Sequence, residues 1–168
     1  MGLDMYLERH HKAVEGYLGE DLDKMKETNP KGYALVKPYI IERGEYIKWK
    51  SLSTEVGYWH KANAIHRWFV ENVQNGEDDC GTYSVSKAEL EELLGICKEL
   101  YEHKDDERFL PNESSPEILL PTQVGFFFGS TAYDEWYWKD INNTIEILEK
   151  VLEETDFDNE VITYTSSW

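Results

Sequence analysis

Seven aromatic side chains fall between Phe126 and Trp138, in the segment FFFGSTAYDEWYW. Hydroxyl and carboxylate groups stand among these rings, at Ser130, Thr131 and Asp134. Aromatic faces beside such groups are typical of a pocket that holds a flat polar ligand, for example a nucleobase. The same rings also dominate protein cores, so packing is the alternative interpretation. The candidate ligand- or partner-binding residues of this region are Gln123, Ser130, Thr131, Tyr133, Asp134, Trp136 and Tyr137.

A second group of candidate residues begins at Trp59. Apolar residues recur at helical spacing from about Trp59 to Val73, which predicts a helix with one buried face. Its other faces carry polar side chains, and an indole stands at its start. This makes the helix the best candidate for an element that presents a site. The candidate binding residues on it are Trp59, His60, Asn63, His66 and Arg67.

Metal binding and covalent catalysis have less support. His60 and His66 are six residues apart, which does not place them on one helix face, and no H-E-x-x-H pattern is present. A zinc site built from His66, Asp78, Asp79 and Cys80 is an alternative, although adjacent aspartates after a glycine favour a turn. Cys80 has His60 or His66 as partners for nucleophilic catalysis, but no family-type signature surrounds it. The usual nucleotide and hydrolase motifs are absent from the sequence. We therefore expect no catalytic residue and no cofactor, and binding is favoured over enzymatic activity.

The charge of the chain is unevenly distributed. Residues 1–75 are neutral, whereas 23 acidic and six basic residues follow Asn75 and account for the whole net charge of −17. Such a field repels nucleic acids and membrane surfaces and attracts basic proteins. We expect a basic protein partner or a small aromatic ligand, and no direct contact with nucleic acid or membrane. A solvated acidic face is the alternative. The sequence does not predict the oligomeric state.

The length of 168 residues and the 40% hydrophobic content predict one domain, over 1–168. No apolar stretch approaches the roughly 18 residues of a membrane span. The first residues lack the basic and apolar regions of a signal peptide, and only Cys80 and Cys97 are present. These features predict a cytoplasmic location.

Alternation of apolar and polar residues predicts strands over about 2–9, 45–50 and 161–165, with further extended segments at 81–85 and 118–128. Besides the helix from 59, helices are expected over about 86–101 and 134–153. The first of these opens with a capping box of Ser86 and Glu89. Ser130 and Thr131 are candidate caps before the second. The sequence thus predicts an α+β domain with a small, mostly antiparallel sheet of four or five strands and about three helices packed on it. Segments 10–42 and 104–117 are expected to be peripheral or loop-rich insertions.

Several longer strings resemble a family of small uncharacterised proteins encoded by bacteriophages, prophages and related bacterial elements. The resemblance covers most of the chain and is weakest at 10–42 and 104–117. It implies a bacterial host cytoplasm and an accessory role in phage–host conflict, and it carries no established activity. At His60 the family string has arginine, which argues against a basic role there. The matching strings are GLDMYL (Gly2–Leu7), EVGYWHKANAIHRWFVENVQ (Glu55–Gln74), DDCG (Asp78–Gly81), LPTQVGFFFGSTAYDEWY (Leu120–Tyr137) and SSW (Ser166–Trp168).

Two functions follow as hypotheses. The first is a phage-type accessory protein that inhibits a host antiphage defence factor by binding it through an acidic surface, as anti-CRISPR proteins do. The alternative is a protein that binds or sequesters a nucleotide, or a nucleotide-derived signal, in an aromatic pocket. A metal- or cysteine-dependent enzyme is the third and least supported hypothesis.

Overall fold

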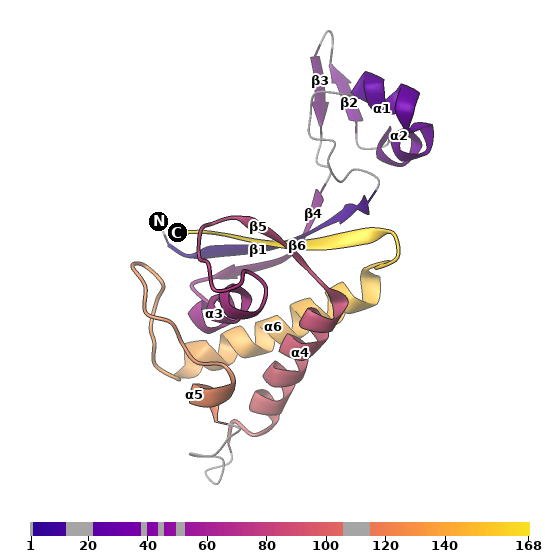
Figure 1. Ribbon diagram of the computed structural model, residues 1–168. Helices are drawn as coiled ribbons and strands as arrows, with labels where there is room; N and C mark the ends of the chain where they lie inside the picture. Colours follow the sequence, from indigo (N-terminus) through magenta and orange to yellow (C-terminus); the bar gives the residue numbers. More distant parts are fainter. Residues whose placement is uncertain (1, 13–21, 38–39, 44–45, 50–52, 106–114) are drawn as a thin grey trace.

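A four-stranded antiparallel sheet forms the centre of the protein (Figure 1). The computed structural model describes residues 2–12, 22–37, 40–43, 46–49, 53–105 and 115–168. The strand order is β4-β1-β6-β5, with β4 Ser53–His60, β1 Asp4–His11, β6 Glu160–Ser167 and β5 Thr82–Val85. Six helices are present in the described residues: α1 Leu22–Thr28, α2 Pro30–Val36, α3 Asn63–Asn72, α4 Lys87–Glu102, α5 Pro116–Leu119 and α6 Glu135–Glu154. The predicted single α+β domain is confirmed.

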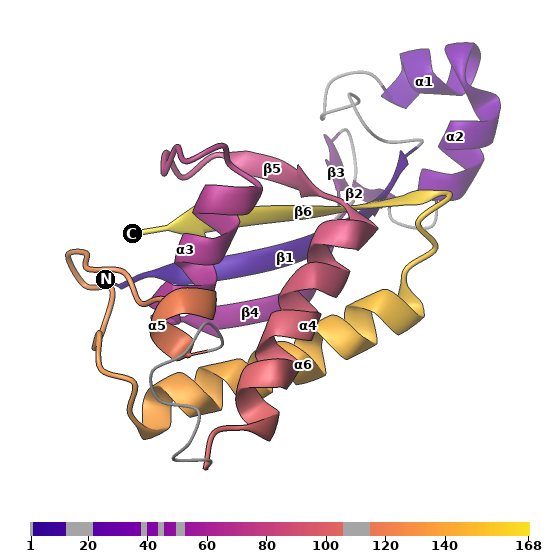
Figure 2. The same ribbon diagram turned by 60° about the horizontal axis from the view of Figure 1, so that its bottom comes forward.

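Helices α3, α4 and α6 cover one face of the sheet (Figure 2). The alternation of buried and partly exposed residues along the strands explains this one-sided arrangement. Met5 and Leu7 of β1 and Ile162 and Tyr164 of β6 are fully buried, while the residues between them remain partly exposed. A sheet with one buried and one open face is typical of antiparallel pairing. The core therefore lies between the sheet and the three helices.

A separate two-stranded sheet, β2 (Ile40–Arg43) and β3 (Tyr46–Trp49), lies with α1 and α2 beyond one end of the main sheet (Figure 1). Most of the segment predicted as a peripheral insertion, 10–42, falls in this region. Residues 13–21 and 38–39 of that segment lie outside the described residues, as do 106–114 of the segment 104–117. The strand expected at 45–50 is β3, and residues 45 and 50 of that expected range also lie outside the described residues.

The predicted start of the helix near Trp59 is wrong, because Trp59 and His60 belong to β4. They pair with Met5 and Asp4 of β1 in the antiparallel ladder. Pairing with a neighbouring strand overrides the local helical pattern. The chain then turns at Lys61, whose φ of 60° is left-handed, and α3 begins at Asn63.

The extended segment predicted at 118–128 is also wrong. Its first residues belong to the short helix α5, and the chain from 121 to 130 pairs with no strand of the main sheet. Pro121 offers no backbone N–H to a ladder. Phe127 and Gly129 both have positive φ, of 67° and 94°, which is incompatible with an extended strand.

The capping box predicted for the helix over 86–101 is present at the start of α4. The Ser86 hydroxyl accepts from the Glu89 amide at 3.2 Å, and the Glu89 carboxylate accepts from the Ser86 amide at 2.7 Å. We expect Ser86→Ala to lower the free energy of unfolding by about 1 kcal/mol, because an amide of the first turn loses its acceptor. Urea unfolding measures the change. Ser84→Ala, at an exposed position of β5, is the control and should change stability by less than about 0.5 kcal/mol.

Candidate functional site

A cavity of about 290 Å³ opens where the end of β4, the start of α3 and the start of α6 meet the segment 122–134. We call it the α3–α6 cavity. Its walls combine an indole, aliphatic side chains and several charged or hydroxyl groups, as ligand pockets generally do. The lining residues are His60, Lys61, Ala62, Asn63, Ala64, Ile65, Thr122, Gly129, Ser130, Ala132, Asp134, Trp136, Tyr137, Asp140 and Ile141.

The first turn of α3 forms one wall of the cavity. The turn at Lys61 is held by a hydrogen bond from its amide to the Leu3 carbonyl, at 2.8 Å. Within the described residues no side chain caps α3, and its first turn contains no acidic residue. The amides of Ala64 and Ile65 have no intrahelical acceptor at these positions, and both residues line the cavity. The cavity therefore borders the positive end of the α3 dipole.

Asn63 connects α3 to the loop on the other side of the cavity. Its Nδ2 donates to the carbonyls of Phe128, at 3.1 Å, and Ser130, at 2.8 Å, and its Oδ1 accepts from the Gln123 amide at 3.1 Å. Asn63 is buried, and all three bonds hold backbone groups of the loop. A Cβ atom at Gly129 would approach the Lys61 carbonyl to 3.3 Å, so the loop also needs glycine there. The loop is thus fixed against the start of α3.

The start of α6 forms the opposite wall. Asp134 caps the helix by accepting from the amides of Trp136, at 2.9 Å, and Tyr137, at 3.3 Å. The predicted capping by Ser130 or Thr131 is therefore wrong: they precede the cap by three or more residues. Trp136 is 67% exposed and its ring lies 5.1 Å from Lys139 Nζ. Tyr137 is buried, donates to the Leu120 carbonyl at 3.0 Å and has its pKa raised, first of all by burial.

His60 stands at the rim of the cavity and is oriented by Asp4. Its Nδ1 lies 2.9 Å from Asp4 Oδ1, which also accepts from the Tyr58 hydroxyl at 2.5 Å. The hydrogen bond from Tyr58, followed by that from His60, lowers the pKa of Asp4. The same carboxylate raises the pKa of Tyr58 to about 12. Asp4 therefore remains ionised and holds one imidazole nitrogen.

Asp140 is a cavity residue that the sequence interpretation missed. Burial raises its pKa to about 6, the Asp134 charge adds to this rise, and Lys139 and His60 oppose it. Its position was recognisable: Trp136 and Asp140 are four apart on α6, so they share a helix face. Lys61, at the turn between strand and helix, also lines the cavity, as a basic group that a phosphate-bearing ligand would need.

Six of the twelve candidate binding residues line the cavity: His60, Asn63, Ser130, Asp134, Trp136 and Tyr137. Trp59 does not; it is buried in the core, where its indole donates to Thr144 Oγ1 at 2.9 Å. Arg67 does not line the cavity either, and its Nε forms an ion pair with Glu71 Oε1 at 2.7 Å. Thr131 and Tyr133 hold the loop together through hydrogen bonds to Thr122. The Thr131 carbonyl accepts from Thr122 Oγ1, and the Tyr133 hydroxyl accepts from the Thr122 amide.

Gln123 contributes to the site through its backbone, because its amide is the donor to Asn63 Oδ1. Its side-chain Oε1 is buried without a hydrogen-bond partner among the described residues. Gln123 is absent from the cavity lining. It therefore positions the loop rather than lining the cavity.

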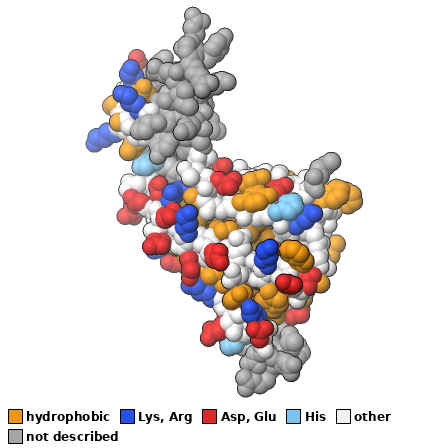
Figure 3. Space-filling model, turned by 180° about the vertical axis from the view of Figure 1, so that it is seen from behind, with side chains coloured by type: hydrophobic (Ala, Val, Ile, Leu, Met, Phe, Trp, Pro, Cys, Tyr) orange, Lys and Arg blue, Asp and Glu red, His pale blue; other side chains and the backbone are white. Residues whose placement is uncertain are grey.

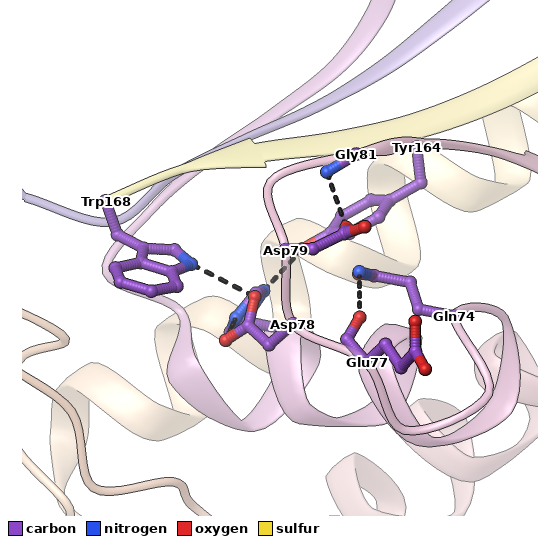
Figure 4. A network of polar contacts seen from close by, with 8 residues as sticks. Gln74, Glu77, Asp78, Asp79, Gly81, Tyr164 and Trp168 are labelled. Carbon is purple, nitrogen blue, oxygen red and sulfur yellow. Dashed lines mark hydrogen bonds and ion pairs between the residues drawn. The ribbon is translucent and has the colours of Figure 1, made fainter.

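His66 belongs to a different cluster, because its ring bonds Asp78 in the loop after α3 and Tyr164 on β6. Asp78, Tyr164 and Trp168 of this cluster are labelled in Figure 4. His66 is fully buried, with Nδ1 2.7 Å from the Tyr164 hydroxyl and Nε2 3.0 Å from Asp78 Oδ2. Asp78 Oδ1 accepts from the Trp168 indole at 3.0 Å.

Asp79 does not join this cluster. It accepts from the Gly81 amide and the Tyr83 hydroxyl, as a turn aspartate does. No group of three or more possible metal ligands gathers within the described part of the chain.

The two cysteines differ in environment. Cys80 is exposed, whereas Cys97 is buried on α4 and burial raises its pKa to about 12. Because the thiolate is the reactive form, we expect Cys80 to react with a thiol reagent and Cys97 to be protected in the folded protein. Mass spectrometry after brief alkylation should show one modified thiol per chain, and two after denaturation. Modification of both thiols under native conditions would contradict the buried position of Cys97.

The excess of acidic residues after Asn75 is spread over several elements. Exposed glutamates lie on α4 (Glu91, Glu92, Glu99, Glu102) and on α6 (Glu135, Glu146, Glu149, Glu153, Glu154). Some are paired, for example Glu149 with Lys98 at 2.6 Å. On the face shown in Figure 3, acidic side chains alternate with basic and hydrophobic ones. No helix of the described residues is long and apolar enough to cross a membrane.

No protein family, curated protein or solved structure matches the chain. The geometry of the α3–α6 cavity therefore carries the functional argument.

Proposed function

We propose that this protein binds a small flat ligand, of the nucleobase or nucleotide type, in the α3–α6 cavity. One observation carries the proposal: two sequence segments that were each singled out as a site, around 59–67 and 123–137, contribute side chains to one cavity. Two segments that contributed to the hydrophobic core alone would not be expected to border the same open, partly polar cavity.

The chemistry of the walls supports a ligand of this class. Trp136 offers an exposed indole on which a flat ring can stack, and the exposed Ala132 adds apolar surface, while Ile65 and Ile141 are fully buried behind the wall. The positive end of the α3 dipole, together with Lys61, is suited to a carbonyl or an anionic group. A volume of about 290 Å³ is near the lower end of ligand pockets, which suits a nucleoside or mononucleotide rather than a larger cofactor.

A thermal-shift series with nucleosides and mononucleotides tests the proposal. At a ligand concentration of about 100 times the dissociation constant, binding adds about 2.7 kcal/mol to stability. We expect Trp136→Ala to weaken binding by about tenfold, because stacking of a base on an aromatic ring contributes about 1 to 3 kcal/mol. Phe126→Ala is the matched control, since Phe126 is 82% exposed but lies outside the cavity lining. Absence of any shift with the whole series would count decisively against the proposal.

The second candidate is binding of a basic protein through the outer faces of α4 and α6. The observation in its favour is the number of exposed glutamates on these two neighbouring helices. Inhibition of a host defence factor by a phage-type protein remains a prediction from charge and resemblance. Salt discriminates between the candidates, because association through exposed charges weakens steeply from 0.05 to 0.5 M salt, whereas a neutral nucleoside in the cavity is held almost equally well.

A further inference from the structure

We propose that Asp140 selects the ligand, and that the α3–α6 cavity takes a flat group with two neighbouring N–H donors on one edge. Guanine and guanidinium groups share this chemistry. The inference rests on the proposed function, since it specifies which part of a flat ligand meets which side chain.

Asp140 has unused hydrogen-bonding capacity. Its carboxyl group lies in the cavity wall and receives no hydrogen bond from the described residues, although its backbone carbonyl accepts from Thr144 Oγ1 at 2.7 Å. A carboxylate that is partly withdrawn from water without donors is unfavourable. A ligand that brings two N–H groups would supply the missing donors in a bidentate arrangement.

The neighbouring basic side chains, Lys139 and His60, do not take this role. Lys139 Nζ lies 5.1 Å from the centroid of the Trp136 ring, and His60 Nδ1 is engaged by Asp4 at 2.9 Å. Both lower the pKa of Asp140, but within the described residues neither donates a hydrogen bond to it. The carboxylate therefore remains available to a molecule inside the cavity.

Asp140 also lies next to the stacking surface of Trp136. Trp136 and Asp140 are separated by one turn of α6, which places their Cβ atoms about 6 Å apart on the same helix face. A flat ring that stacks on the indole would therefore direct one edge at the carboxylate. The opposite edge would face the start of α3, at the positive end of its dipole, and the Lys61 side chain. This arrangement suits a ring with N–H donors on one edge and a carbonyl or anionic group elsewhere.

The expected pH dependence follows from this contact. The pKa of Asp140 is raised to about 6 by burial and by Asp134, and it is lowered by Lys139 and His60; Lys61 is a further charge on the cavity wall. N–H donors bind the ionised carboxylate, so binding is strongest above this pKa and weakens as the pH falls through it. Between pH 7.5 and pH 5.0 the ionised fraction falls about tenfold, and the affinity should fall by about the same factor.

Isothermal titration with guanosine, inosine, adenosine and agmatine tests the inference. Guanosine presents two N–H donors side by side, inosine presents one, and adenosine presents an amino group without the adjacent ring N–H. Agmatine carries a guanidinium without a nucleobase and separates the two sources of the same chemistry. None of these ligands has a group that titrates between pH 5.0 and pH 7.5 near the recognised edge. The variants are Asp140→Asn and, as a control on the same helix outside the cavity lining, Glu135→Gln.

We expect guanosine or agmatine to bind at least tenfold more tightly than inosine or adenosine at pH 7.5. Asp140→Asn should remove this preference and the pH dependence, because a charge-assisted pair contributes about tenfold or more. Glu135→Gln should keep both. Equal binding of all four ligands, or an unchanged preference in Asp140→Asn, would overturn the inference and leave the proposed function standing. Binding of none of them to the unmodified protein would overturn both. The pH dependence of the unmodified protein tests the inference even where Asp140→Asn does not fold.

Discussion

Replacing Asn63 with alanine should lower the free energy of unfolding by about 3 to 5 kcal/mol and abolish ligand binding. The side chain is buried and serves three backbone groups, the carbonyls of Phe128 and Ser130 and the amide of Gln123. Each group would be left in a partly dry environment without its partner, at a cost of about 1 to 3 kcal/mol each. The loop would also lose its fixed position against α3, and with it one wall of the cavity.

Asn72→Ala is the matched control, because Asn72 is exposed and, among the described residues, donates to the Trp68 carbonyl alone, at 2.8 Å. We expect a change below about 1 kcal/mol and unaltered binding. Urea unfolding monitored by tryptophan fluorescence measures both variants. If Asn63→Ala were as stable as the control, the loop would not depend on this side chain, and the description of how the cavity is built would be wrong.

Replacing His66 with alanine should have the second largest effect, a loss of about 3 to 5 kcal/mol. His66 is fully buried and is bonded on one side to Tyr164 and on the other to Asp78. The change would leave a cavity, a buried tyrosine hydroxyl and a carboxylate without its imidazole. Because Asp78 also accepts from Trp168, the end of β6 should loosen as well.

Tyr164→Phe separates the hydrogen bond from the packing. It keeps the ring that stacks on Phe69 at a centroid distance of 4.0 Å and removes only the hydroxyl, so we expect a loss of about 1 to 2 kcal/mol. Tyr83→Phe is the control, since its hydroxyl bonds the exposed Asp79. Hydrogen exchange of the β6 amides and urea unfolding provide the measurements. A His66→Ala variant that lost no more stability than Tyr83→Phe would show that the cluster is not a structural anchor.

Much of the fold was predictable because local patterns and tertiary packing agree. The alternation in β1 and β6, the capping box of α4 and the apolar stripe of α6 each indicate the element that forms. The errors arise where neighbours in space override the local pattern. Trp59 and His60 fit a helix by spacing, but pairing with β1 keeps them in a strand.

The candidate site was predictable in part for the same reason. Types and spacing identified Asn63, Asp134 and Trp136, but the cavity also depends on a turn at Lys61 and on burial of Asp140. Left-handed backbone geometry at a lysine and the environment of a single carboxylate are properties of the folded chain. No local pattern encodes them.

Backbone amide shifts recorded during titration with guanosine test the central claim most directly. We predict that the perturbed amides cluster on both walls of the α3–α6 cavity, in residues 61–65 and 129–141, and that Trp136→Ala suppresses the perturbations. Absence of perturbation by guanosine and by every other nucleoside of the series, or perturbations confined to a surface remote from these residues, would contradict the assignment of the cavity as the ligand site.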